Sequence, residues 1–542
     1  MRVQGPPSRV SPSALLIGAL TGLLAYSAMF ARGGLLVDDA FISFRYAVNL
    51  AEHGELVFNL GERVEGYSNF SWTLLLAALT KIGIRPPLAA PALGYGLGLL
   101  TLALTYRTAR RALGCSPLSA GIAMAIPALN PSFTFWAGAG MESALFALLL
   151  LGLVQALWSD PARHRAGPTM LAAVAALTAL TRPEGLALGL LVAGMAIALH
   201  REGWRRFVWP TVGFLAVVAV HVAWRRAYYG DWLPTSVFAK VGPSAAAGLR
   251  GARYLGGFLW HEGLLWLLPI AGFVQWRDAR YWTLGAVIAS YCAFVMVVGG
   301  DGLYGYRLPA HILPLFGLAV ASGLDRLQRG ARRILPAVVA GVAVVLAVCA
   351  TRRDFFRNYS IAEVRSWEER WEQVGLAIAR HTPPGSLLAT NVVGRIPYFS
   401  RQPTLDLLGL TDRVVAHKPV AGLGDGYAGH ERAAPAYVLG RRPAIIYFSV
   451  LDGLPEPGFR DLRVTHSVLA AGSLYRYAPL LEAAELEQEY APAFVRLDDG
   501  RWAGLFVRIA NRAWDREPDG LRISSWTESS PARASPDGTP PR

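Results

Sequence analysis

The chain has 542 residues, of which 53% are hydrophobic and only 17% charged, and its mean hydropathy is +0.34. This composition is too apolar for an ordinary soluble enzyme and is typical of a chain that crosses a membrane many times. The three cysteines, Cys115, Cys292 and Cys349, lack C-x-x-C spacing and lie in or beside apolar runs, which excludes a cysteine zinc site and a disulfide framework.

The net charge of +14 is unevenly distributed. The first 350 residues hold 28 basic and 15 acidic residues, whereas the remainder holds 24 and 23. An arginine excess in the apolar part of the chain is expected where basic residues anchor cytoplasmic loops. The sequence contains no basic helix interleaved with aromatic residues and no recognised nucleic-acid module, so nucleic acid is not an expected partner.

The chain begins with a polar segment that contains Arg2 and Arg9, followed by an apolar run from Ser13 to Phe30. The run has about the length of a membrane span, and we interpret it as a retained first helix. A signal peptide cleaved near Ala31 is the alternative.

Twelve apolar windows have the character of membrane spans. They lie at 13–31, 70–84, 88–106, 117–135, 142–158, 168–181, 185–199, 207–224, 263–276, 281–298, 308–323 and 334–350. Arginine clusters between these windows predict which ends are cytoplasmic, and they put the two ends of the chain on opposite sides of the membrane. An odd number of crossings is therefore required, and we expect 11 or 13 helices. The twelve windows conflict with this odd number between residues 70 and 106, where two windows must supply an odd number of crossings. Either one of these two windows is re-entrant or interfacial, or Pro127 to Pro131 split the next window.

The acidic residues agree with this topology. Of the 15 acids in the first 350 residues, 11 fall in segments assigned to the outer side. They are Asp38, Asp39, Glu52, Glu55, Glu62, Glu65, Glu142, Glu184, Asp231, Glu262 and Asp301. We therefore expect the chemistry at the outer face of a transmembrane catalytic domain, residues 1–350, whose first outer loop is 38–69.

The pattern of apolar and polar residues changes after residue 350. Residues 351–527 alternate helical and strand-like runs, which predicts an extracytoplasmic α/β domain. Arg365 to Arg380 has a helical pattern, and Ser386–Thr390 and Ala444–Phe448 are expected to be buried strands. Residues 528–542 are rich in proline and serine, which predicts a disordered tail.

Two adjacent carboxylates, Asp38 and Asp39, directly follow the first apolar segment. Ionisable groups at membrane depth are costly and tend to mark reaction sites or pathways, although two acids just outside the bilayer would only mark the end of a span. Phe41, Phe44 and Val48 recur at helical spacing, which predicts an amphipathic helix along the membrane surface, with the phenylalanines packed at the interface. A carboxylate held there could accept a proton from an attacking sugar hydroxyl.

Several stretches resemble a known family in their joint order and spacing. They are DDAF (38–41), FRYAVNLAEHGELVFNLGERVEGYSNFSWTLLLA (44–77), WAGAGMES (136–143), LTRPEGLALG (180–189), YYGDWLPTSVFAK (228–240), GGDGLYGYRLP (299–309), IPYFSRQPTLDLLGLTDR (396–413) and GHERAAPAYVLGRRPAIIYF (429–448). Together they resemble the GT-C superfamily of integral-membrane glycosyltransferases. Within it they are similar to the mycobacterial arabinofuranosyltransferases that add terminal arabinose to cell-wall arabinan.

The resemblance implies an enzyme of the bacterial plasma (inner) membrane that moves arabinofuranose or a similar sugar from a polyprenyl-phosphate donor to a glycan or lipid acceptor of the cell envelope. It implies a site open to the extracytoplasmic face, and it places the acidic motif on Asp38 and Asp39, one of them acting as general base. The leaving lipid phosphate needs no proton, so one base and cations around the phosphate form a sufficient set. A single displacement would invert the anomeric centre.

Candidate cations for the donor phosphate are Arg182, Lys240 and Arg307, each with a structural alternative. The arginines would pair with neighbouring acids, and Lys240 would reach lipid phosphates in general. Further residues expected in the substrate site are Glu142, Asp301, Tyr67 and Asn69. His430 and Glu431 are candidates for holding the acceptor glycan, with a capped turn as the alternative.

Asp38, Asp39 and Glu142 also offer the hard oxygen ligands that suit Mg²⁺ or Mn²⁺, although adjacent aspartates are a weak metal signal. The alternative functions are the same fold acting on lipid A, O-antigen or protein acceptors, and a transporter or flippase of polyprenyl-linked glycans. Transporters commonly contain internal repeats, and the sequence shows none.

Overall fold

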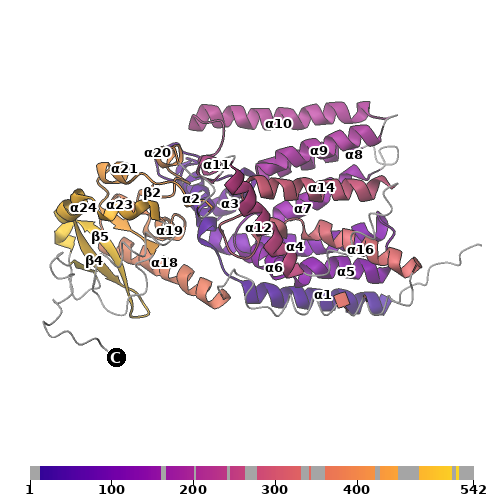
Figure 1. The fold of residues 1–542 in the computed structure, drawn as a ribbon, viewed down its shortest axis with the longest axis horizontal. Coiled ribbons are helices and arrows are strands. Elements are labelled where there is room, and N and C mark those ends of the chain that lie inside the picture. The colour runs from indigo at the N-terminus through magenta and orange to yellow at the C-terminus, as the bar shows by residue number, and fades with distance from the viewer. Residues whose placement is uncertain are drawn as a thin grey trace, which may run out of the picture.

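The computed structural model describes residues 12–159, 166–200, 203–240, 244–262, 278–330, 338, 341–342, 360–420, 426, 428–449, 475–514 and 521–523. Long helices run side by side in a bundle, and a smaller region of strands and short helices lies at one end of it (Figure 1). The predicted windows 263–276 and 334–350 lie almost entirely outside the described residues, and so does the predicted tail, 528–542.

The bundle is built from apolar helices. They are α1 (Pro12–Gly33), α4 (Pro86–Arg111), α5 (Pro117–Leu129), α6 (Pro131–Gly138), α7 (Ser143–Leu157), α8 (Gly167–Thr181), α9 (Glu184–Leu199), α10 (Arg205–Tyr229), α14 (Ala279–Val297) and α16 (Leu313–Gly330). Among the described helices, α4, α10 and α14 are each long and apolar enough to cross a membrane, and the pair α5 and α6 would make a fourth span. The helices α7, α8 and α9 are apolar but shorter.

A bend of 56° separates α5 from α6. Pro131 begins α6 and disfavours a helical conformation at Asn130, whose ψ is 121°. The Asn130 side chain accepts a hydrogen bond from the Ser132 N–H at 2.9 Å, which caps α6. The helix therefore breaks at Asn130, directly before Pro131, whereas Pro127 lies inside α5.

The helix α3 (Phe70–Lys81) lies near the end of the bundle next to the C-terminal region (Figure 1). At its start, the Ser71 hydroxyl lies 2.7 Å from the Thr181 hydroxyl at the end of α8. At its end, Lys81 Nζ donates to the Ala51 carbonyl of α2 at 3.2 Å. The window at 70–84 therefore does not traverse the bundle. The count of 11 or 13 helices stays a prediction because parts of the chain lie outside the described residues.

The helix α2 (Asp38–His53) ends at Gly54, whose φ of 75° favours glycine. The interpretation that Phe41 and Phe44 pack at the membrane interface is wrong, since they are only 1% and 0% exposed. Both rings contact Tyr398 of the C-terminal region, with centroids 5.2 and 6.3 Å apart. The helix is thus a buried element between the bundle and the C-terminal region.

The C-terminal region contains one six-stranded sheet with the order β2-β1-β3-β5-β4-β6. The two expected strands are present as β1 (Leu388–Thr390) and β3 (Ile445–Tyr447), which pair directly and in parallel. The other strands are β2 (Thr404–Asp406), β4 (Tyr490–Arg496), β5 (Trp502–Arg508) and β6 (Leu521–Ile523). The strands β5, β4 and β6 run antiparallel to their neighbours, so the predicted α/β region has a mixed sheet. Its boundaries, 351–527, stay a prediction.

The helix predicted over Arg365 to Arg380 is α18 (Ile361–His381), which starts with a capping box made by Ser360 and Glu363. It packs on α19 (Arg395–Ser400), which also contacts α2. The remaining elements are the 18-residue helix α12 (Ala245–Glu262) and several short ones. The short ones are α11 (Thr235–Lys240), α15 (Arg307–Ala310), α20 (Arg413–Ala416), α21 (Pro435–Gly440), η3 (Tyr475–Tyr477), α23 (Ala478–Leu481), α24 (Ala484–Glu489) and η4 (Ile509–Trp514).

Candidate active site

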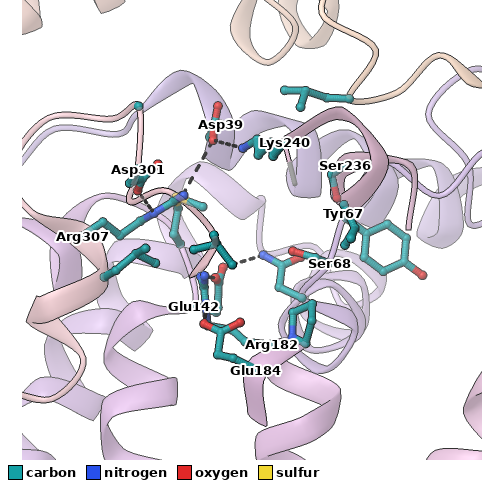
Figure 2. A pocket seen from close by; sticks show the side chains of 18 of the residues that line it. Asp39, Tyr67, Ser68, Glu142, Arg182, Glu184, Ser236, Lys240, Asp301 and Arg307 are labelled. Carbon is teal, nitrogen blue, oxygen red and sulfur yellow. Dashed lines mark hydrogen bonds and ion pairs between the residues drawn. The ribbon is translucent and has the colours of Figure 1, made fainter. Parts of the chain in front are cut away.

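A cavity of about 270 Å³ lies where α2, α9, α11 and the 299–307 loop meet (Figure 2). Eight residues singled out from the sequence line it. They are Asp39, Tyr67, Asn69, Glu142, Arg182, Lys240, Asp301 and Arg307. The tertiary structure therefore brings together residues from six distant stretches of the chain, five of which supply acids or bases. Asp38, His430 and Glu431 do not line this cavity.

Asp39 faces the cavity and two cations. Its Oδ2 atom lies 3.5 Å from Lys240 Nζ and 3.8 Å from Arg307 Nη1. Burial alone would raise the pKa of this carboxyl, but the charges of Lys240 and Arg307, helped by His430, outweigh burial and lower the pKa. Asp39 is thus a carboxylate at the wall of the cavity.

Asp38 points away from the cavity, because consecutive residues of a helix lie about 100° apart around its axis. Its two carboxyl oxygens accept hydrogen bonds from the N–H groups of Gly394 (3.0 Å) and Arg395 (2.6 Å). Its own N–H donates to Glu368 Oε1 at 3.0 Å. Burial, and then the charge of Glu368, raise the pKa of Asp38 to about 8. Asp38 therefore ties α2 to the C-terminal region.

Ion pairs and hydrogen bonds around Arg182 form one wall of the cavity. Its Nη1 lies 2.5 Å from Glu142 Oε1, and its Nε lies 2.5 Å from Glu184 Oε1. Asn69 Nδ2 donates to the second oxygen of Glu142 at 2.7 Å. Buried charges persist where such partners satisfy them. Arg182 is thus already held by two carboxylates.

Arg307 is held by its surroundings as well. Tyr306, directly before it, has a φ of 47°, in the left-handed region. The Nε atom of Arg307 lies 2.7 Å from Asp301 Oδ2, and its guanidinium lies 5.5 Å from the centre of the Trp136 ring. Both the acid and the aromatic ring therefore fix its orientation.

Lys240, at the end of α11, is the least constrained of the three cations. Its ion pair with Asp39 is its only one in the described part of the chain, and its side chain is 34% exposed. The Thr235 N–H donates to the Glu65 carbonyl at 2.8 Å, which holds the start of α11 against the first loop. Lys240 can therefore turn toward a ligand at small cost.

His430 and Glu431 lie beside the cavity rather than in its wall. His430 is close enough to Asp39 and Lys240 to interact with both electrostatically. Glu431 Oε1 lies 3.3 Å from Arg250 Nη1 and accepts the Gly426 N–H at 3.0 Å. The acceptor role of both residues stays a prediction.

The acids proposed as metal ligands do not converge. Asp38 turns toward Gly394 and Arg395, Asp39 faces cations, and Glu142 pairs with Arg182. Among the described residues, no three His, Cys, Asp or Glu side chains form a group that could hold a metal ion. These three acids thus do not fit a shared Mg²⁺ or Mn²⁺ ion.

Glu368 was not predicted from the sequence, although it connects three elements near the cavity. Besides the Asp38 N–H, it accepts hydrogen bonds from the Tyr304 hydroxyl (2.8 Å) and from Arg395 Nε (2.7 Å). No pattern distinguishes Glu368 from the other charged residues of α18. Ser68 and Ser236 of the cavity wall were not predicted as site residues either.

The sequence has named relatives. Residues 357–502 match a family described as a domain of unknown function (DUF8728). The chain is 35% identical over 223 residues to the terminal beta-(1->2)-arabinofuranosyltransferase of Mycobacterium tuberculosis, which covers 38% of this chain and 35% of that protein. It is 28% identical over 357 residues to the protein of the same name from Corynebacterium glutamicum, covering 56% of this chain and 49% of that protein. The match thus spans about half, or less, of the length of these relatives.

The fold has a solved counterpart. The crystal structure of ArnT from Cupriavidus metallidurans bound to undecaprenyl phosphate matches with a TM-score of 0.54 and 14% identity, over 92% of this chain and 98% of that chain. At that identity the likeness concerns the fold alone. The chain is therefore a multi-pass membrane protein with an ArnT-like fold, similar over part of its sequence to the terminal beta-(1->2)-arabinofuranosyltransferases.

Proposed function

We propose that the chain is a glycosyltransferase that moves arabinofuranose, or a similar sugar, from a polyprenyl-phosphate donor to a cell-envelope glycan. The observation that carries the proposal is the cavity in which Asp39, Lys240 and Arg307 meet. Two relatives named as arabinofuranosyltransferases support the sugar, and the undecaprenyl phosphate bound by ArnT supports the donor class.

In this proposal Asp39 is the general base. An acceptor hydroxyl attacks the anomeric carbon, its proton passes to Asp39, and the bond from that carbon to the phosphate oxygen breaks. The polyprenyl phosphate leaves without needing a proton, and a single displacement inverts the anomeric centre. The position of Asp38 favours Asp39 as the base, since the oxygens of Asp38 accept hydrogen bonds from Gly394 and Arg395 outside the cavity.

Lys240 and Arg307 are the proposed partners of the donor phosphate. Arg182 is a weaker candidate because Glu142 and Glu184 already occupy its guanidinium. A phosphate placed between Lys240 and Arg307 would share the two charges that lower the pKa of Asp39. The donor would thereby raise that pKa and make Asp39 a better base once the donor is bound.

We further propose that the cavity and the sheet region lie on the extracytoplasmic side of the bacterial plasma membrane. The arginine clusters of the sequence gather at loops assigned to the opposite side. Because α3 does not traverse the bundle, we expect eleven crossings.

The test is transfer by the purified full-length chain from a panel of polyprenyl-phosphate sugars, offered arabinan, lipid A and peptide acceptors. We expect turnover of an arabinofuranose donor with arabinan, and a loss of about 10²- to 10⁴-fold in Asp39→Asn. Ser236→Ala, which changes an uncharged residue of the same cavity, should stay within a few-fold of wild type. EDTA should leave turnover unchanged, since Asp38, Asp39 and Glu142 do not converge on a shared metal site.

Two results would contradict the proposal. Full activity of a folded Asp39→Asn variant would remove Asp39 as the base. Folded wild-type protein that turns over no donor with any acceptor would favour transport of polyprenyl-linked glycans instead.

A further inference from the structure

A second cavity, of about 560 Å³, lies on the other side of α2 from the candidate active site. The helix contributes Asp39 to the first cavity and Asn49, Glu52 and His53 to the second. The other walls of the second cavity come from the start of α4, from α19 and from the residues that follow α19. This cavity thus lies at the seam between the bundle and the C-terminal region.

The lining of this cavity is basic. It contains three arginines, Arg45, Arg85 and Arg401, against one acid, Glu52. Arg45 is buried and donates to backbone carbonyls at 2.6 to 2.8 Å, so it is already satisfied. Arg85 and Arg401 are exposed, and no ion pair holds either of them within the described residues. Two arginines are therefore available to an anionic ligand.

The cavity borders an exposed apolar surface. Ile84 precedes Arg85 and is 43% exposed. Ile82 and Leu88, which lie on either side of it in the sequence, are each 71% exposed. Large apolar side chains exposed on a membrane protein are expected to face the hydrocarbon, and arginine beside them marks the head-group level. Aromatic and aliphatic groups of the lining, such as Tyr398, continue the apolar surface into the cavity.

We propose that this cavity binds the phosphate head group of an anionic membrane lipid. Arg85 and Arg401 contact the phosphate, and the acyl chains lie along Ile82, Ile84 and Leu88. Guanidinium groups match phosphate oxygens in geometry and charge. A soluble glycan fits less well because it has no apolar tail for the exposed isoleucine and leucine side chains. The bound lipid would bridge the bundle and the C-terminal region.

The proposal is tested by native mass spectrometry of the full-length protein released from detergent, titrated with phosphatidylglycerol or phosphatidylcholine. We expect one phosphatidylglycerol to be retained in preference to phosphatidylcholine. Arg85→Gln and Arg401→Gln should each weaken phosphatidylglycerol binding about fivefold, and the double variant about 25-fold.

A matched double variant, Arg253→Gln with Arg496→Gln, removes one exposed arginine from α12 and one from β4. It should bind lipid as the wild type does. If the double variant of the cavity fails to fold, the two single variants carry the test.

Three outcomes would overturn the proposal. One is equal retention of the two lipids. Another is equal weakening of lipid binding in the matched control. The third is displacement of the lipid by millimolar inorganic phosphate, which indicates a free-anion site, or by an arabinan fragment, which indicates an acceptor site. Binding is measured without turnover, so failure of the proposed activity leaves this test intact.

Discussion

At the scale of single residues, two adjacent aspartates have separate roles. Asp39 faces Lys240 and Arg307 across the cavity, whereas Asp38 accepts backbone hydrogen bonds from the C-terminal region. The sequence cannot separate them because each is an acid at the first turn of the same helix. One step of 100° around the helix axis decides which one meets a substrate.

Lys240→Gln tests the proposed donor contact. Removing a cation that turns toward the donor phosphate should raise KM for the donor about tenfold, with a smaller change in kcat. Lys240 is also the cation that most lowers the pKa of Asp39. The acidic limb of the pH–rate profile should therefore move to higher pH in the variant.

Lys418→Gln, an exposed lysine outside the cavity, is the control and should leave both KM and the pH profile unchanged. An unchanged KM and an unchanged acidic limb in Lys240→Gln would show that Lys240 contacts neither the phosphate nor Asp39.

At the scale of elements, α2 is a wall shared by two cavities and a contact for the C-terminal region. Glu368 of α18 holds the first N–H of α2, the hydroxyl of Tyr304 and the guanidinium of Arg395. The 299–307 loop, which carries Arg307, therefore shares a buried anchor with the helix that carries Asp39. Displacement of α18 should therefore shift both α2 and the 299–307 loop, which form two sides of the candidate active site.

The buried carboxyl of Asp38 predicts a pH dependence of stability. Its pKa is about 8 in the folded protein, and the ordinary value of 3.8 applies in the unfolded protein. Between these two pH values the folded state therefore retains a proton that the unfolded state has lost. The free energy of unfolding should consequently fall as pH rises from about 4 to about 8. Asp38→Asn cannot titrate, so its Tm should fall less than that of the wild type between pH 5 and pH 8.5.

Asp278→Asn, at the other end of the bundle, is the matched control and should keep the wild-type slope of Tm against pH. If Asp38→Asn and the wild type have the same slope, Asp38 does not carry a raised pKa.

At the scale of the whole molecule, the first end of the bundle lies next to the sheet region (Figure 1) and holds the candidate active site. The α3 helix stays at the first end, whereas α4 leads away from it toward Arg111. This arrangement predicts opposite exposure of the two ends in the cell.

Cysteine labelling tests the proposed orientation. In a background without the three native cysteines, Lys418→Cys should react with a membrane-impermeant maleimide in intact cells. Arg111→Cys should react only after the cells are permeabilised. Both residues are exposed, so reactivity reports the side of the membrane rather than burial. Labelling of Arg111→Cys alone in intact cells would reverse the orientation.

The sequence by itself determined the class of protein, the two expected strands and most of the candidate site. These depend on patterns that are visible along the chain: apolar windows, apolar runs such as Ala444–Phe448, and the order and spacing of motifs. The sequence also located the parity conflict between residues 70 and 106, because charge bias is counted along the chain.

Only the tertiary structure decided which aspartate enters the cavity, that Phe41 and Phe44 are buried against Tyr398, and that Glu368 joins three elements. It also decided that Arg182 pairs with two carboxylates, whereas Lys240 pairs with Asp39 alone among the described residues. The physical reason is that these properties depend on partners far away in sequence. Hydrogen bonds and ion pairs between such partners exist only after the bundle and the C-terminal region have packed together.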